Sequence, residues 1–165
     1  MIRGLGHFYR STGARLDIQL VRKGLHVREL EALIDEEGLT DQVNWSDEMS
    51  LSEVWARYAA SDIVFDQLGL SAIGAVGVDA MATGRPVIGN ARPEMFEDLS
   101  GEAAPICQAK TPEEVSAQLQ RLVFDSEERE RVGRAGRRYA EEHLDISRFA
   151  QILLQRLEVA LRSKK

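Results

Sequence analysis

The chain has a single cysteine, Cys107, among its 165 residues. One cysteine can form neither an internal disulfide nor a cysteine-rich zinc site. The three histidines, His7, His26 and His143, stand far apart in the sequence and lack the spacing of metal ligands. The sequence therefore predicts no metal site and gives no support to metal catalysis.

Long hydrophobic runs and a surplus of basic residues are also absent. No apolar segment approaches the roughly eighteen residues that cross a bilayer, and the first ten residues do not resemble a leader peptide. We therefore expect a cytoplasmic protein. The chain has 21 Lys and Arg against 27 Asp and Glu, a net charge of -6, which argues against general binding of nucleic acid.

The composition is that of one globular domain. Hydrophobic residues make up 44% and charged residues 29% of the chain, close to the averages for folded domains. No repeat, low-complexity tract or Pro/Gly/Ser-rich linker divides the sequence. Residues 1–165 are therefore predicted to form a single domain.

Short apolar runs alternate with longer amphipathic segments through most of the chain. The runs that predict strands are 16–21, 42–45, 62–65, 86–89 and 105–107. The segments that predict helices are 2–12, 26–37, 50–60, 111–124, 126–142 and 145–162. This order predicts an α/β fold, a three-layer Rossmann-like domain with a mainly parallel sheet and a helical C-terminal tail.

The expected helices carry recognisable start signals and apolar stripes. Ser50 with Glu53, and Thr111 with Glu114, have the spacing of capping boxes. The last segment has one stripe of large apolar residues, which we expect to pack on the domain. The stripe consists of Ile146, Phe149, Leu153, Leu157 and Leu161.

The segment 62–90 is the most informative for function. It reads as a strand, a loop of small residues at Gly74, a short helix that carries Asp79, and another strand. Backbone N–H groups at the start of such a helix can hold a phosphate, and a carboxylate about one turn later can accept hydrogen bonds from ribose. The small residues are equally suited to close packing of the helix on the sheet, and this structural reading stays open.

Three motifs resemble a known family. Residues 79–88, DAMATGRPVI, resemble the E-A-M-A-x-G-x-P-V-[IV] segment of retaining nucleotide-sugar glycosyltransferases with two Rossmann domains, the GT-B enzymes of glycosyltransferase family four, or group 1. Residues 38–43, GLTDQV, and residues 58–64, YAASDIV, are similar to two further motifs of that family. The resemblance extends over nearly the whole chain.

The resemblance implies the C-terminal, donor-binding half of such an enzyme, which binds a nucleotide-sugar as its donor substrate and needs no other cofactor. Asp79 matches the family's ribose-binding glutamate, and the diphosphate would lie against the backbone of Ile73, Gly74, Ala75 and Val76. Ser71 falls where the family has a second glutamate that contacts the sugar. Either the sugar specificity differs, or Asp66 or Gln67 replaces that carboxylate, or catalysis is weak. Trp45 either stacks on the nucleobase or packs at the end of its strand.

The family's catalytic Arg and Lys have no match in this chain. Arg22-Lys23-Gly24 has the residue types of the family's segment. However, the residues between it and the strand at Val43 have room for one helix only, whereas the family has a helix, a strand and a second helix there. The family's catalytic pair therefore corresponds to a position before Met1, and so does the family's first strand, which lies near the middle of the sheet. The absence of that strand predicts unpaired strand edges. The possibilities are a truncation, a split protein, strand donation by another chain, or rearrangement of the two neighbouring strands into direct contact.

The expected function is thus donor binding in a glycosyltransferase that an N-terminal acceptor domain or a second chain completes. The acceptor and the catalytic residues are unknown. The chain alone is not expected to transfer sugar, because one half cannot exclude water from the reacting centre. The alternative is a non-catalytic nucleotide-sugar-binding or partner subunit. The interleaved Arg and Glu residues of 126–142 predict a solvated, self-paired helix face, with a membrane surface as a weaker alternative.

Overall fold

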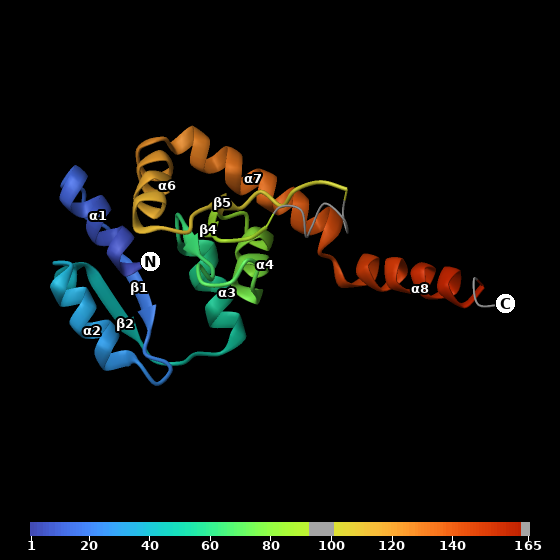
Figure 1. Ribbon diagram of the computed structural model, residues 1–165, viewed down its shortest axis with the longest axis horizontal. Coiled ribbons are helices and arrows are strands. Elements are labelled where there is room, and N and C mark those ends of the chain that lie inside the picture. Colours follow the sequence, from blue (N-terminus) through green and yellow to red (C-terminus); the bar gives the residue numbers. More distant parts are fainter. Residues whose placement is uncertain (93–100, 163–165) are drawn as a thin grey trace.

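The computed structural model describes residues 1–92 and 101–162, and strands and helices alternate through it (Figure 1). The strands are β1 (Ile18–Val21), β2 (Val43–Ser46), β3 (Val64–Phe65), β4 (Val87–Gly89) and β5 (Cys107–Gln108). The helices are α1 (Ile2–Thr12), α2 (Val27–Glu36), η1 (Thr40–Gln42), α3 (Leu51–Ala60), α4 (Ala75–Ala82), α6 (Pro112–Phe124), α7 (Ser126–His143) and α8 (Ile146–Arg162). The predicted α/β class is confirmed, and the strands lie at the predicted places.

The strands form two sheets where one was expected. β1 pairs with β2, and β3, β4 and β5 pair in that order, with every pair parallel. In Figure 1, β1 is the strand of the first sheet nearer to the second sheet. β1 and β3 thus each have one edge without a partner strand among the described residues. The prediction of unpaired strand edges is confirmed.

The backbone direction at these two edges follows from single hydrogen bonds. The Arg22 N–H donates to Ser46 O at 2.8 Å, so even-numbered residues of β1 point their N–H groups towards β2, and Gln19 and Val21 point theirs away. The Val64 N–H donates to Pro86 O at 3.0 Å, so the backbone N–H of Phe65 in β3 points away from β4.

One apolar cluster holds the two sheets together. Ile18 of β1 and Ile88 of β4 belong to the same buried cluster, with Phe8 of α1 and Leu119 of α6. α1 approaches α6 closely because Gly4 has no side chain. A Cβ at that position would lie only 2.4 Å from Val115 Cγ1. The sheets therefore share a core although no strand joins them.

Local signals set the helix ends as expected. Both capping boxes form, at Ser50 with Glu53 and at Thr111 with Glu114. α2 ends before Gly38, whose φ of 70° lies in the left-handed region that glycine adopts at little cost. Ion pairs along α7, such as Arg131 with Glu128 at 2.6 Å, confirm the self-paired helix face.

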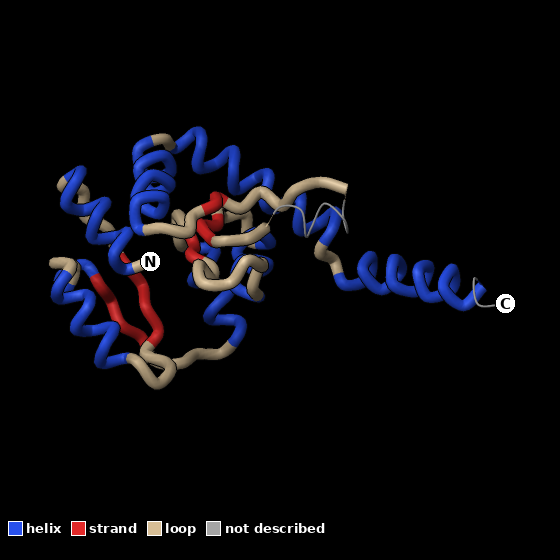
Figure 2. The backbone as a smooth tube through the Cα atoms, in the orientation of Figure 1, coloured by secondary structure: helices blue, strands red, loops and turns tan. Residues whose placement is uncertain are grey.

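The expectation for the C-terminal stripe is wrong. α8 extends away from the rest of the molecule, and its described apolar side chains are exposed (Figure 2). Ile146 is 81% exposed and Leu161 is 68% exposed, whereas packing on the domain would bury both. The side chain of Phe149 lies outside the described set. The stripe is present, but the domain offers it no surface. None of the described helices is long and apolar enough to cross a membrane.

Candidate functional site

The candidate site lies at the carboxyl ends of β3 and β4, where parallel sheets of this class bind ligands. β3 ends at Phe65, and residues 66–74 form the loop that leads into α4. The Asp66 N–H continues the ladder by donating to Ile88 O at 2.9 Å, so Asp66 starts the loop from a fixed backbone position.

The Asp66 side chain lies against the first turn of α4. Its Oδ2 accepts the N–H of Gly74, the residue before the helix, at 2.6 Å. A Cβ at Gly74 would lie 2.6 Å from Asp66 Oδ1, and a Cβ at Gly77 would lie 2.6 Å from Asp66 Oδ2. The two glycines thus make the space that the carboxylate fills.

Backbone donors of α4 remain beside this carboxylate. The first bond within the helix is donated by Val78 N–H to Gly74 O at 3.1 Å. The N–H groups of Ala75, Val76 and Gly77 precede that bond and have no carbonyl partner within the helix. Three donors at the positive end of the helix dipole form the arrangement that holds phosphate groups.

Amide side chains shape the rest of the loop. Gln67 Nε2 donates to Ala72 O at 3.1 Å, and Asn90 Nδ2, at the end of β4, donates to Leu68 O at 3.0 Å. Asn90 is 8% exposed, and among the described residues its Oδ1 has no hydrogen-bond partner. The Gln67 amide therefore joins two parts of the loop, and the Asn90 amide holds the loop to the end of β4.

Asp79 lies in the second turn of α4 and is half-buried. The phenol of Tyr58, on the neighbouring helix α3, lies within electrostatic reach of Asp79. Burial raises the pKa of Tyr58, and the carboxylates of Asp79 and then Asp66 raise it further. Tyr58 therefore stays a neutral hydroxyl within electrostatic reach of the two carboxylates of this region.

The structure brings together most of the residues expected at the site. Ser71, Ile73, Gly74, Ala75, Val76 and Asp79 all lie in the loop or in α4. Ile73 and Val76 are also packed against the apolar cluster of α4 and α7, so the small-residue packing and the loop coexist. Tyr58 was missed as a site residue, although it opens the motif at 58–64. No spacing rule links a residue of α3 to the loop after β3.

Trp45 lies elsewhere. It belongs to β2, in the other sheet, and packs against the shared core. The guanidinium carbon of Arg22 lies 4.7 Å from the centroid of its ring, a cation–π contact. The packing interpretation of Trp45 is therefore confirmed, and its stacking on a nucleobase stays a prediction.

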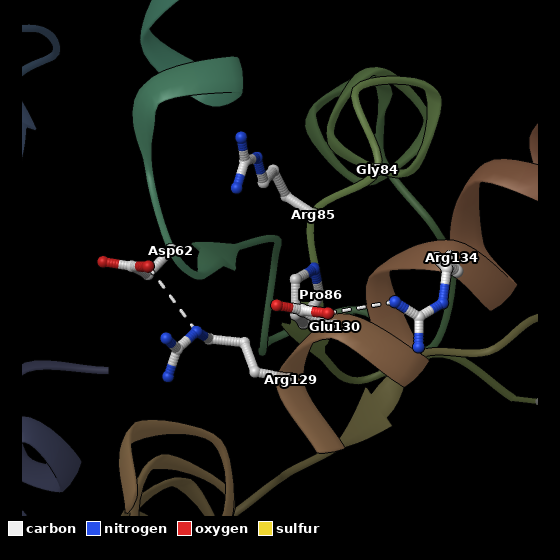
Figure 3. Close-up of a pocket in the computed structure, with 7 residues that line it drawn as sticks. All are labelled: Asp62, Gly84, Arg85, Pro86, Arg129, Glu130 and Arg134. Atoms are coloured by element: carbon white, nitrogen blue, oxygen red, sulfur yellow. Dashed lines mark hydrogen bonds and ion pairs between the residues drawn. The ribbon is translucent and has the colours of Figure 1, made fainter. Parts of the chain in front are cut away.

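A pocket of about 220 Å³ lies at the opposite ends of the strands (Figure 3). Asp62 before β3 and Arg85 before β4 line it together with Arg129 and Arg134 of α7. Arg129 pairs with Asp62 at 3.5 Å, and Arg134 pairs with Glu130 at 3.0 Å. The pair of Arg129 with Asp62 joins α7 to the start of β3, whereas Arg134 and Glu130 both belong to α7. The pocket is distinct from the loop at α4.

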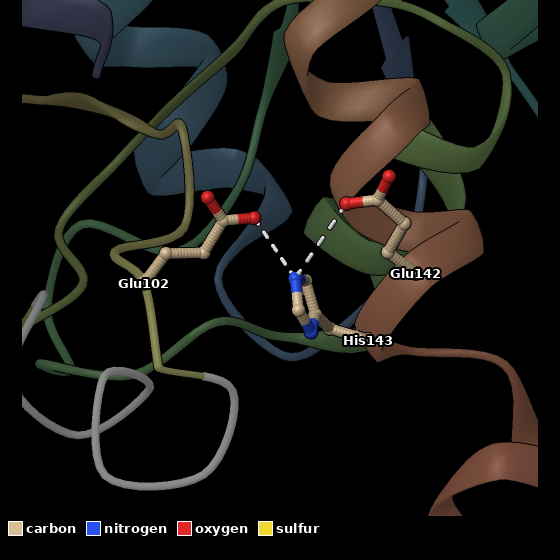
Figure 4. Close-up of side chains that lie close together, drawn as sticks. All are labelled: Glu102, Glu142 and His143. Carbon is tan, nitrogen blue, oxygen red and sulfur yellow. Dashed lines mark hydrogen bonds and ion pairs between the residues drawn. The ribbon is translucent and has the colours of Figure 1, made fainter.

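One cluster of side chains could hold a cation, although no sequence spacing indicated it (Figure 4). His143 Nε2, at the end of α7, lies 2.8 Å from Glu102 Oε1 and 3.8 Å from Glu142 Oε2. These are ion-pair distances when the imidazole is protonated. The cluster connects α7 to the segment before β5, away from the loop.

Comparison with known proteins identifies the family. Residues 9–139 match the family described as glycosyl transferases group 1. The chain is 31% identical over 150 residues to the MMP alpha-(1->4)-mannosyltransferase of Mycolicibacterium hassiacum, covering 86% of this chain and 36% of that protein. The chain thus spans little more than a third of that relative.

Two solved structures share the fold. Sucrose-phosphate synthase from Thermosynechococcus elongatus aligns with a TM-score of 0.69 at 20% identity, over 99% of this chain and 43% of that one. A mutant of S. aureus TarM, in complex with fondaparinux, alpha-GlcNAc-glycerol and UDP, aligns with a TM-score of 0.69 at 14% identity. The alignment covers 93% of this chain and 31% of that one. The family match, the relative and the parallel α/β fold agree: the chain belongs to the group 1 glycosyltransferases and has the Rossmann-like fold of their GT-B members.

Proposed function

We propose that residues 1–165 form a single donor-binding domain that holds a nucleotide-sugar at the loop between β3 and α4. The observation that carries this proposal is the arrangement at α4, where three N–H groups without a carbonyl partner in the helix precede Val78 and the Asp79 carboxylate follows one turn later. Phosphates and a ribose hydroxyl are the groups that such a pair of features recognises.

Each part of the donor has a proposed contact. The diphosphate lies on the backbone from Ile73 to Val76, and Asp79 accepts hydrogen bonds from the ribose. Ser71 faces the sugar with a hydroxyl, and Trp45 is kept as the residue that stacks on the base. The reaction needs no resident cofactor, because the nucleoside diphosphate of the donor is itself the leaving group. We further propose retention of the anomeric configuration and a cytoplasmic location.

The donor and the acceptor are proposed only by class. The name of the mycobacterial relative supports a mannosyl group, and the TarM complex supports a uridine nucleotide. One name indicates a sugar and the other a base, and neither specifies a complete donor, so a panel of bases and sugars is needed. The acceptor belongs to the part of the enzyme that this domain does not contain.

We propose that an N-terminal domain completes the enzyme and supplies a strand between β1 and β3. The free edges of these two strands support this, and so does the partial coverage of each relative. Partial burial also lowers the pKa of the Met1 amino group, and Ile2 beside it is 4% exposed. Ile2 belongs to the same buried cluster as Ile18 of β1. A segment that precedes Met1 would therefore start beside this cluster, and a second chain could supply the same strand.

Calorimetric titration tests the donor site. Uridine, guanosine and adenosine diphosphates and their sugars are titrated into the chain and into Asp79→Ala. We expect one base to bind saturably and the substitution to weaken binding by about 1–2 kcal/mol, the scale of a lost hydrogen bond to a charged acceptor.

Asp62→Ala is the matched control, because Asp62 is an exposed carboxylate at the other end of β3. It should leave binding unchanged. Absence of binding by the folded chain would contradict a donor site in this domain.

The alternative is a binding or partner subunit without catalysis, which Ser71 and the unmatched catalytic pair favour. Transfer activity after addition of an N-terminal half would decide for the enzyme. Donor binding without transfer in the completed protein would decide for the subunit.

A further inference from the structure

The Asp66 carboxylate lies where the proposed donor needs positive potential. It accepts the Gly74 N–H at 2.6 Å and fills the space over the first turn of α4 that Gly74 and Gly77 leave open. The N–H groups of Ala75, Val76 and Gly77, which have no carbonyl partner within the helix, belong to the same turn. A negative side chain thus already lies beside the backbone N–H groups that would bind the diphosphate.

The proximity is built into the fold. The Asp66 backbone is fixed by its bond to β4, so the carboxylate reaches α4 from a rigid strand end. An alanine at Gly74 or at Gly77 would place a Cβ 2.6 Å from a carboxylate oxygen. The glycines and the aspartate are therefore complementary in shape.

We propose, on the basis of the function proposed above, that Asp66 is an affinity-determining residue of the donor site. Its carboxylate occupies the first turn of α4 when no donor is bound, and it competes with the donor diphosphate for that turn. Two anions at one helix end repel each other, and the repulsion is strong where solvent is partly excluded. Diphosphate binding must therefore move the carboxylate or tolerate its charge.

The test separates the charge of Asp66 from its hydrogen bond. Asp66→Asn keeps an oxygen that can accept the Gly74 N–H and removes the negative charge. We expect it to bind nucleoside diphosphates about tenfold more tightly than the unchanged chain, because a like charge has been removed. Affinity for the matching nucleoside, which has no phosphate, should not change.

Asp62→Asn is the matched control. It removes the same charge from an exposed carboxylate at the opposite end of β3, which pairs with Arg129 at 3.5 Å. It should leave the affinity for diphosphates unchanged. Equal tightening in both variants would attribute the effect to net charge and would overturn the proposal.

The remaining outcomes are also decisive. If the unchanged chain binds diphosphates and Asp66→Asn binds them equally or more weakly, Asp66 does not compete and the inference fails while the donor site stands. A loss confined to the nucleotide-sugars would make Asp66 a sugar contact and would also overturn it. If neither folded protein binds, both the inference and the donor site fail. Should Asp66→Asn not fold, Asp66→Ser, which also retains an acceptor oxygen, is judged by the same criteria.

Discussion

At the residue scale, two glycines of α7 mark close packing of that helix rather than turns. A Cβ at Gly133 of α7 would lie 2.3 Å from the carbonyl oxygen of Gly84, and one at Gly136 would lie 3.2 Å from Met81 Cγ. Gly84 itself has a φ of 74°. The packing of α7 on α4 therefore depends on the absence of side chains at the contact, and this packing supports the helix that carries Asp79.

Gly133→Ala should destabilise the domain because the contacted atom is backbone and cannot rotate away. We expect a loss of about 1–3 kcal/mol in the free energy of unfolding, typical of overpacking. Urea denaturation followed by circular dichroism measures it. Gly69→Ala is the control, since a Cβ there meets nothing within 4 Å. Equal stability of the two variants would contradict the close contact.

Cys107 should react slowly with thiol reagents in the folded protein. Burial raises the pKa of its thiol, and the guanidinium of Arg121, 3.1 Å from Sγ, offsets part of this effect. Because only the thiolate is nucleophilic, alkylation by iodoacetamide at pH 8, followed by mass spectrometry, should be much slower without urea than with it. Equal rates would show that the thiol is accessible.

The same pKa shift has a consequence for stability. The folded-state pKa lies above the unfolded one, so the unfolded chain loses its proton first as the pH rises. The contribution of Cys107 to stability is therefore complete below the ordinary pKa of a thiol and is lost as the pH rises through the folded-state value.

At the element scale, two helices begin with the same capping box but differ in their burial. α6 buries Val115, Leu119 and Leu122, whereas α3 has no buried residue. A lost cap at α6 must therefore be felt by the core, while the first turn of α3 can fray alone. Sequence identifies both caps, but it does not say which helix end matters to the whole domain.

Thr111→Ala should lower the free energy of unfolding by about 1 kcal/mol, the usual effect of a lost N-cap. Ser50→Ala is the paired variant and should cost less, because fraying of α3 exposes no core residue. Thermal denaturation of both variants provides the comparison. A larger loss from Ser50→Ala would contradict the assignment of α6 to the core.

At the scale of the whole molecule, the notable feature is a parallel fold whose strands form two sheets that share one of the two apolar clusters. The shared apolar cluster maintains the arrangement, and β1 and β3 each have an edge that meets no partner strand in the part of the chain that the structure describes. Backbone groups at such edges normally find partners in water or in another strand. The domain is thus expected to be stable at its core and labile at these two edges.

Hydrogen exchange monitored by NMR tests this difference. The amides of Gln19, Val21 and Phe65 point away from their sheets and should exchange faster than those of Leu20 and Val64 on the same strands. If an N-terminal segment supplies the missing strand, its addition should protect the first three amides. Equal protection in the isolated chain would contradict the two-sheet arrangement.

Much of the fold could be predicted from the sequence because its signals are local. Capping boxes, the glycine after α2 and the alternation of β-branched runs with amphipathic segments depend on neighbours within a few residues. The motif at 79–88 indicated the family, and the family match confirms it. Ser71, Gly74 and Asp79 were placed in one segment of chain, so their proximity required no knowledge of tertiary contacts.

The amino-acid sequence by itself determined the order of strands and helices, the helix ends, the family and the segment proposed to bind the donor. Only the tertiary structure decided that Asp66 lies against Gly74 and Gly77, that Tyr58 lies within electrostatic reach of Asp79, and that the apolar face of α8 is exposed. The reason is physical. Hydrogen bonds within a turn and the period of a helix depend on adjacent residues, whereas the contact of a strand end with a helix, or the lack of a surface for α8, depends on how distant segments pack.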